Sequence, residues 1–312
     1  MPKSLRLIIQ GIMETVLKTN KLTKVYGRRK VVDGVSMTIN KGDIYGFIGK
    51  NGAGKTTFMR TVLSLTSISS GEVELFGGKR IEEVGNKIGS LIEAPGLYKN
   101  ATAYENLKRF SILYGADESK INDILRFVNL DKTGKKKAKD FSLGMRQRLG
   151  IAIALLGDPE FLVLDEPING LDPAGIKEIR DVILKLNKEL GITFLISSHL
   201  LDELAKVVTK YGIINNGVLL EEVSAKELIN NCKNKLIIKT DDNEKAKELI
   251  KSEFDIKKID SIKDKLVLYS NLESSALINK YLVKKGILVS EIYTEVDSLE
   301  EYFIRKIGDT NE

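Results

Sequence analysis

The chain has 312 residues, of which 42% are hydrophobic and 29% charged, and these values are typical of a globular protein with about two domains. Its single cysteine, Cys232, excludes an internal disulfide and a cysteine-rich metal site, and so favours a reducing, cytoplasmic compartment. No run approaches the roughly 20 apolar residues of a membrane-spanning helix.

The net charge of +6 permits an anionic partner. The densest basic run, Lys135–Lys139, is interpreted as a solvated loop, because lysines elsewhere are mixed with acidic residues. No aromatic–basic pattern of RNA binding accompanies it, so nucleic acid is not an expected partner. Residues 1–12 are predicted to form an N-terminal extension before the fold begins.

The first predicted elements are two strands, Thr15–Thr19 and Val31–Ile39, which we expect to pair antiparallel. A turn at residues 40–43 leads into a third, buried strand that ends at Ile48.

The segment Gly49–Thr57 then has the form G-x-x-x-x-G-K-[ST] of a phosphate-binding P-loop. It lies between a strand and a predicted helix start, so its glycines and the helix N-terminus can present backbone N–H groups to phosphate oxygens. Lys55 can reach the β- and γ-phosphates, and the Thr56 hydroxyl can bind Mg²⁺. The predicted nucleotide ligands of this loop are Gly49, Asn51, Gly52, Ala53, Gly54, Lys55, Thr56 and Thr57.

Helical periodicity covers about Ala103–Leu156, which predicts a helical subdomain at about 94–157. The apolar strand Phe161–Leu164 follows, and Asp165 and Glu166 come directly after it. The carboxyl end of a strand faces ligand in an α/β sheet, and adjacent strand residues point opposite ways. We therefore expect Asp165 to hold the metal and Glu166 to orient or deprotonate the attacking water.

An amphipathic helix is predicted over Asp172–Leu190, stopped by Gly191, and the strand Ile192–Ile196 follows it. The only histidine, His199, comes just after that strand. An imidazole at this edge can bridge the γ-phosphate and the attacking water, although a lone histidine is more commonly structural. Residues 215–217, Asn-Asn-Gly, predict a β-hairpin.

Beyond about Lys233 the pattern changes to a βαββαβ order, which predicts a small α+β ferredoxin-like domain over 233–312. Its charges alternate as on a solvated surface. It is interpreted as a dimer-contact or regulatory module, with an inert stabilising appendage as the alternative.

The motifs occur in the order typical of an ABC-transporter ATPase subunit, with 141–148 at the place of that family's signature. The chain resembles this family over about Thr15–Leu228. The resemblance implies an α/β P-loop NTPase (RecA-like) core with an antiparallel β subdomain and an α-helical subdomain, over 13–232. It also implies ATP and Mg²⁺ as cofactors and a homodimer in which ATP lies between the P-loop of one copy and the signature of the other.

Further site residues follow from the resemblance. Ser142, a good helix N-cap, and Gly144 would contact the partner's γ-phosphate. Asp172 belongs to the same nucleotide site, and Tyr26 matches the aromatic residue that stacks on adenine, with a packed strand-end tyrosine as the alternative. The signature departs from the family pattern at Leu143 and Met145, and Met145 cannot copy the contact of the family's glutamine.

Glu93 stands where the family usually has a glutamine that completes the Mg²⁺ shell. A carboxylate is an equally hard oxygen ligand. The surrounding residues 88–98 look like those of the bacitracin-resistance and lantibiotic self-immunity exporters. The alternative is neutral drift at this position.

The leading hypothesis is the ATP-binding subunit of an exporter. A dimer would couple ATP hydrolysis to a separate membrane permease, held at the inner face of the membrane, with an antimicrobial peptide or drug as cargo. Two alternatives stay open: a soluble ABC ATPase acting on ribosomes or DNA, and an ATP-dependent switch without transport.

Overall fold

The computed structural model describes residues 14–231, 234–254, 256, 258–269, 274–296 and 299–308. The predicted extension, residues 1–12, lies outside the described residues. The chain divides into two units, Met1–Ala225 and Lys226–Glu312.

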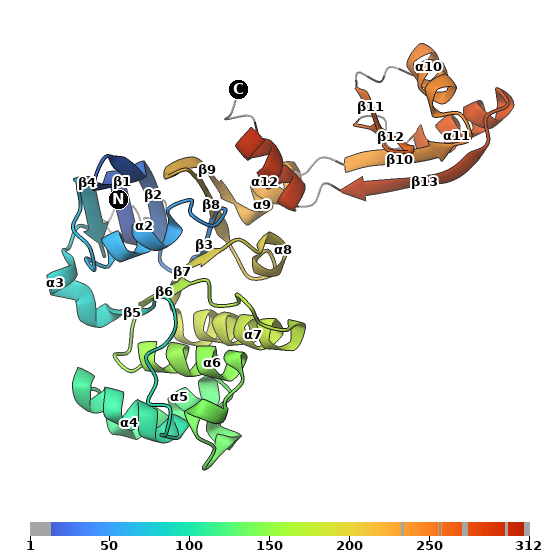
Figure 1. The fold of residues 1–312 in the computed structure, drawn as a ribbon. Coiled ribbons are helices and arrows are strands. Elements are labelled where there is room, and N and C mark those ends of the chain that lie inside the picture. The colour runs from blue at the N-terminus through green and yellow to red at the C-terminus, as the bar shows by residue number, and fades with distance from the viewer. Residues whose placement is uncertain are drawn as a thin grey trace, which may run out of the picture. The chain divides into compact units, whose positions relative to one another are not determined.

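The first unit is built around a six-stranded sheet in the order β5-β6-β7-β3-β8-β9 (Figure 1). Its strands are β3 (Ile44–Ile48), β5 (Ile88–Leu91), β6 (Phe161–Asp165), β7 (Thr193–Ser198), β8 (Lys210–Asn215) and β9 (Val218–Ser224). All neighbours pair in parallel except β8 and β9. Every residue of β3, β6 and β7 is buried, as expected for central parallel strands covered on both faces. The carboxyl ends of these three strands therefore meet at one edge.

The hairpin between β8 and β9 confirms the predicted turn. Asn216 and Gly217 have φ angles of 48° and 83°, the left-handed conformation that a two-residue type I′ turn requires at both central positions.

A second, antiparallel sheet has the order β2-β1-β4. It consists of β1 (Thr15–Tyr26), β2 (Arg29–Asn40) and β4 (Ser70–Leu75). The sequence pattern predicted the first two strands and their antiparallel pairing, but not β4, half of whose residues are exposed. Leu17 and Met37 of this sheet share a hydrophobic core with Phe47 and Phe58, so the two sheets pack as one unit.

The other named elements of the first unit are helices. They are α2 (Lys55–Val62), α3 (Ile81–Val84), α4 (Ala103–Tyr114), α5 (Ile121–Phe127), α6 (Leu143–Ala154), α7 (Pro173–Leu190) and α8 (Leu201–Leu204), followed by α9 (Ala225–Asn231). Short 3₁₀ turns occupy 85–87, 118–120, 131–133 and 138–140. Asp172 caps α7 at its start, and Gly191, with a φ of 67°, ends it.

The second unit contains a four-stranded antiparallel sheet in the order β11-β12-β10-β13. Its elements are β10 (Asn234–Thr240), α10 (Asn243–Glu253), β11 (Ile259–Ile262), β12 (Lys265–Leu268), α11 (Ser275–Lys284), β13 (Val289–Val296) and α12 (Leu299–Gly308). Apolar residues of the sheet and of α10 and α11, such as Leu236, Leu266, Ile250 and Ile278, form one core. This order and pairing confirm the predicted ferredoxin-like arrangement.

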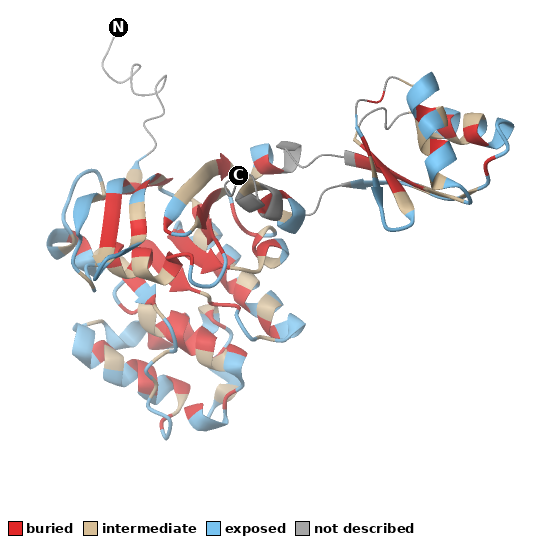
Figure 2. Cartoon of the chain, turned by 45° about the horizontal axis from the view of Figure 1, so that its top comes forward, coloured by how far each residue is buried: buried red, intermediate tan, exposed pale blue. Residues whose placement is uncertain are grey.

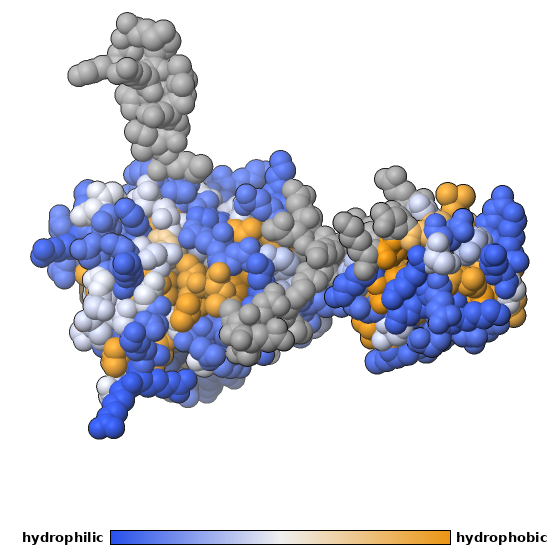
Figure 3. Space-filling model, turned by 90° about the horizontal axis from the view of Figure 1, so that it is seen from above, coloured by the Kyte–Doolittle hydropathy of each residue, from blue (hydrophilic) through white to orange (hydrophobic). Residues whose placement is uncertain are grey.

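Buried residues are concentrated in the strands of both units, and the outer faces of the helices are exposed (Figure 2). The face in Figure 3 carries mostly hydrophilic side chains with smaller apolar groups between them. Within the described part of the chain, no helix has the length and apolar character needed to cross a membrane.

Candidate functional site

The P-loop requires glycine at two positions because backbone passes close by. A Cβ on Gly54, whose φ is 106°, would lie 2.4 Å from the Val31 carbonyl oxygen. A Cβ on Gly49 would lie 2.5 Å from the Ile214 carbonyl oxygen. The loop runs directly into α2, whose first backbone N–H groups have no partners within the helix. These groups form an anion site at the start of α2.

Lys55 is held across this loop. Its Nζ donates to the Gly49 carbonyl at 2.6 Å and lies 3.1 Å from Oε1 of Glu166. The side chain is only 5% exposed. The cation is therefore already placed beside the loop amides, where a phosphate would add a further anionic partner.

Thr56 and Asp165 form the second part of the site. The Thr56 hydroxyl donates to Oδ2 of Asp165 at 2.7 Å. Oδ1 of Asp165 accepts from the Ser197 hydroxyl at 2.5 Å, and that same hydroxyl oxygen accepts from the Glu166 backbone N–H at 2.8 Å. Asp165 and Ser197 lie opposite each other in the β6–β7 register. Ser197 was not among the predicted site residues, because the pairing of these strands is not readable from local sequence.

The neighbouring carboxylates have different partners. Glu166 Oε2 lies 2.9 Å from Nδ1 of His199, while its Oε1 faces Lys55. Glu166 has a φ of 49°, an uncommon left-handed conformation outside glycine. The structure thus brings together Lys55, Glu166 and His199 at the carboxyl edge of the sheet.

A pocket of about 190 Å³ lies over these residues. It is lined by Val31, Asn51, Gly52, Gly54, Lys55, Thr56, Thr57 and Glu166. Val31, on β2, was not predicted from the sequence, because only the tertiary fold brings it over the loop.

The donor set suits Mg²⁺, which prefers oxygen ligands and is usually held by one or two carboxylates together with water and substrate phosphates. Thr56 and Asp165 supply a hydroxyl and a carboxylate. In the described residues no three His, Cys, Asp or Glu side chains form a preformed metal cluster. The Thr56 hydroxyl and the Asp165 carboxylate therefore fit a Mg²⁺ ion whose other ligands are water and the phosphates of a bound nucleotide.

Glu93 lies at the other end of α2. Its Oε1 accepts from Arg60 at 2.5 Å, and its side chain is 64% exposed. Its φ is 66°. One oxygen of the carboxylate is thus engaged by the last turn of α2 in this structure, whereas Thr56 and Asp165 contact each other directly.

A separate pocket of about 400 Å³ contains the signature residues. The Ser142 hydroxyl accepts from the Met145 N–H at 3.2 Å and caps α6, as predicted, and Gly144 lies in the first turn. Asp172 also lines this pocket, where its carboxylate accepts from the Gly175 N–H at 3.0 Å. The starts of α6 and α7 thus share one pocket, and none of its lining residues borders the P-loop pocket.

Tyr26 ends β1 with its side chain in the open. The residue is 48% exposed, and Nζ of Lys24 lies 4.9 Å from its ring centroid. Its hydroxyl is 3.4 Å from Oγ1 of Thr66. An exposed ring of this kind has a free surface for stacking on a planar ligand.

Comparison with known proteins gives concordant matches. The family described as "ABC transporter" matches residues 32–169. The chain is 45% identical over 301 residues to the bacitracin transport ATP-binding protein BcrA of Bacillus licheniformis, covering 95% of this chain and 98% of that protein. It is 45% identical over 207 residues to the lantibiotic transport ATP-binding protein SrtF of Streptococcus pyogenes, covering 66% of this chain and 90% of that protein.

A solved structure of an ABC transporter's ATP-binding cassette in its ADP conformation superimposes with a TM-score of 0.63. Its sequence identity is 28%, and the match covers 70% of this chain and 95% of that one.

Proposed function

This chain belongs to the ATP-binding subunits of the ABC transporter family, and on that premise we propose that it drives export of a peptide antibiotic through a separate membrane permease. The observation that carries the proposal is the likeness to a bacitracin transport ATP-binding protein along 95% of the chain, including the second unit. The lantibiotic transport relative supports the same class of cargo. These relatives do not favour the ribosome- or DNA-acting alternative.

As a member of this family the chain is an ATPase, and the proposed roles of its residues follow from the contacts. The P-loop amides and Lys55 hold the β- and γ-phosphates, and Tyr26 stacks on the adenine. Thr56 and Asp165 hold Mg²⁺. When bound, that ion neutralises charge on the phosphate oxygens.

Glu166 orients the attacking water and accepts its proton, and His199 fixes the other oxygen of the same carboxylate. Lys55 loses its ion pair with Glu166 Oε1 when it turns to phosphate, which frees that oxygen for the water. Glu166 is thus held by Lys55 before phosphate binds, and by His199 when its free oxygen accepts the proton of the water.

A second copy completes the site in this proposal. Ser142 and Gly144 lie in a pocket separate from the P-loop pocket, and two helix starts face that pocket. The start of α7 is already capped by the Asp172 carboxylate, whereas the start of α6 is capped by the neutral Ser142 and favours an anion, and the γ-phosphate on the partner's P-loop is the anion it would receive. Asp172 would act in the same interface.

The permease would bind the surface formed by residues 93–106. Tyr98 and Tyr104 there are 42% and 38% exposed and can contact a partner. This contact would hold the subunit at the cytoplasmic face of the membrane.

Replacing Glu166 by Gln tests the dimer and the proton-accepting role. The variant should bind Mg-ATP, lose turnover, and elute as a dimer with saturating ATP on size exclusion. Glu189→Gln, an exposed change on α7, is the control and should behave as the native chain. A Glu166→Gln chain that stays monomeric with ATP contradicts the sandwich.

Transport is tested in a sensitive host that expresses the chain with its neighbouring permease gene. The native pair should raise resistance to bacitracin or a lantibiotic, and Glu166→Gln should abolish that gain. No gain with any peptide antibiotic overturns the proposed cargo while leaving the ATPase assignment intact. Resistance that persists with Glu166→Gln contradicts export driven by ATP turnover.

A further inference from the structure

A further hollow of the first unit lies at the edge of the sheet opposite the P-loop. It encloses about 600 Å³, within the range of small-molecule sites. Lys41, Glu160 and Ile192, which line it, precede β3, β6 and β7 respectively. The nucleotide residues follow those same strands, so this hollow is separate from the ATP site.

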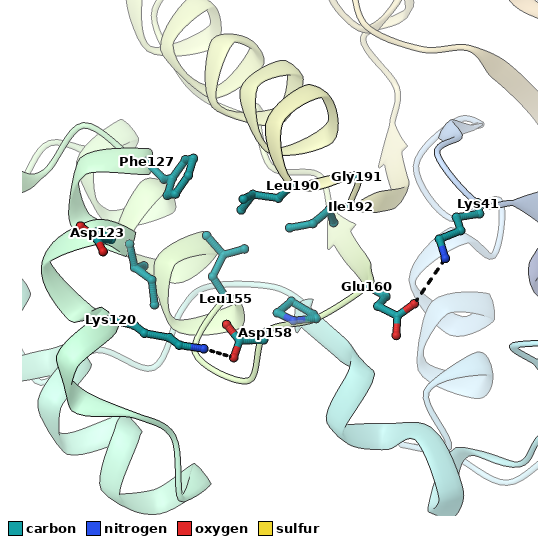
Figure 4. A pocket seen from close by; sticks show the side chains of 12 residues that line it. Lys41, Lys120, Asp123, Phe127, Leu155, Asp158, Glu160, Leu190, Gly191 and Ile192 are labelled. Carbon is teal, nitrogen blue, oxygen red and sulfur yellow. Dashed lines mark hydrogen bonds and ion pairs between the residues drawn. The ribbon is translucent and has the colours of Figure 1, made fainter.

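Its interior is apolar. Ile124 of α5, Leu155 after α6, and Ile192 before β7 are buried at its base, and Pro159 completes this wall. In Figure 4 the side chains of Phe127, Leu155, Leu190 and Ile192 surround the same space. Leu190, in the last turn of α7, is 51% exposed there. An exposed apolar side chain in a concave wall marks a surface that a ligand can cover.

The charged side chains at the rim all have partners. Lys120 pairs with Asp158, and Lys41 with Glu160, at two places on the rim (Figure 4). Asp123 pairs with Arg126 at 2.8 Å. Glu160 also binds Lys87, and Lys41 binds Glu14, at 2.5 Å and 2.8 Å.

Each of these lining charges lies beside an opposite charge, so the mouth presents no field of a single sign that would attract an ionic ligand. The hollow thus offers apolar contact inside and paired polar groups at its mouth. This combination favours an uncharged molecule with a large apolar body.

We propose that this hollow is a binding site for an uncharged, largely apolar small molecule, distinct from ATP. Its apolar body would lie against Phe127, Leu155 and Leu190, with any polar substituent at the rim. A ligand there would contact both the helical subdomain, through α5, and the sheet core, through the residue before β7.

The test uses two fluorescent probes with the same ring system. N-phenyl-1-naphthylamine is uncharged, and 8-anilino-1-naphthalenesulfonate adds one negative charge. The full chain should bind the uncharged probe saturably at one site that Leu190→Gln weakens by about fivefold, the scale expected for removing one apolar wall contact. Leu184→Gln is the matched control, since Leu184 is also exposed on α7 (41%) but does not line the hollow.

Leu190→Met keeps an apolar side chain at this position and should retain the binding. It therefore separates the loss of an apolar contact from damage to α7. Unfolding temperatures establish that each variant is folded. For the anionic probe, the part of the binding that Leu190→Gln removes should be smaller than for the uncharged probe. The proposal is overturned if the uncharged probe is indifferent to Leu190→Gln, if Leu184→Gln weakens it equally, or if the anionic probe fills the site at least as well.

Discussion

At the scale of single residues, Ser197 links the two carboxylates of the site. Its hydroxyl donates to Asp165 and accepts from the Glu166 backbone N–H, so one oxygen orients both neighbours. It is fully buried. Partners of this kind position the groups that meet the metal and the water.

Ser197→Ala should therefore lower ATP turnover by about 10–100-fold, the usual cost of losing a partner of a metal-binding group. Nucleotide binding through the P-loop should persist, so the loss should fall on kcat and on the Mg²⁺ requirement. Steady-state hydrolysis and fluorescent-nucleotide titration measure these two effects.

Ser111→Ala is the matched control, because Ser111 is buried in α4 and bonds only to its own helix. If both serine variants turn over ATP equally well, Ser197 has no positioning role.

The other informative residue is Glu93, which is paired with Arg60. The pair is 40% and 64% exposed, so it contributes little to folding. Glu93→Gln should change the unfolding free energy by less than about 1 kcal/mol. It should retain ATP binding but alter resistance in cells that contain the permease, because Glu93 belongs to the surface at 93–106 where we propose that the permease binds.

Arg60→Gln breaks the same ion pair but keeps the Glu93 carboxylate. Comparing the two variants therefore separates the effect of losing the ion pair from the effect of losing the carboxylate. Drug resistance left untouched by Glu93→Gln would mean that Glu93 has no part in coupling.

At the scale of elements, the P-loop and α2 are the clearest case of sequence dictating local structure. Gly54 must be glycine for two reasons: its φ of 106° and the Val31 carbonyl, 2.4 Å from where a Cβ would stand. Gly52 has a positive φ of 81°, but no atom lies within 4 Å of its Cβ position.

Gly54→Ala should abolish nucleotide binding and destabilise the first unit by more than Gly52→Ala. The latter should cost only the backbone strain of about 1–2 kcal/mol. Denaturant unfolding and ATP titration of both variants make the comparison. Equal effects of the two changes would show that the Val31 contact is unimportant.

The strands differ in how far their own residues predict them. The strands β3, β6 and β7 are buried along their whole length, have a run of apolar residues at their centres, and were predicted within one or two residues. The edge strand β4 has only one buried residue, Leu75, and so carries no hydrophobic pattern. Its pairing with β1 defines it instead.

At the scale of the whole molecule, the chain has two units with separate cores, and the contacts divide them at Ala225 and Lys226. The sequence pattern predicted the boundary between the two domains at 232–233. The proposed role of the second unit is self-association or regulation.

A chain ending at Ala225 should keep a cooperative unfolding transition and ATP binding, because the site lies wholly in the first unit. Its ATP-dependent self-association should weaken, as measured by sedimentation. Unchanged association and turnover would identify the second unit as an inert appendage.

The sequence by itself determined the features that depend on near neighbours. The P-loop, the Asn216-Gly217 turn, and the caps of α6 and α7 all follow from residues a few positions apart. A backbone turn or a helix cap is a short-range balance of sterics and hydrogen bonds, so it is readable locally.

Only the tertiary structure decided which distant residues share a site. It joined Ser197 to Asp165, Arg60 to Glu93, and Asp172 to the Ser142 pocket. These contacts depend on the order and register of parallel strands and on how the helices pack against them. No local periodicity encodes that arrangement, because it is selected by burial of the whole core.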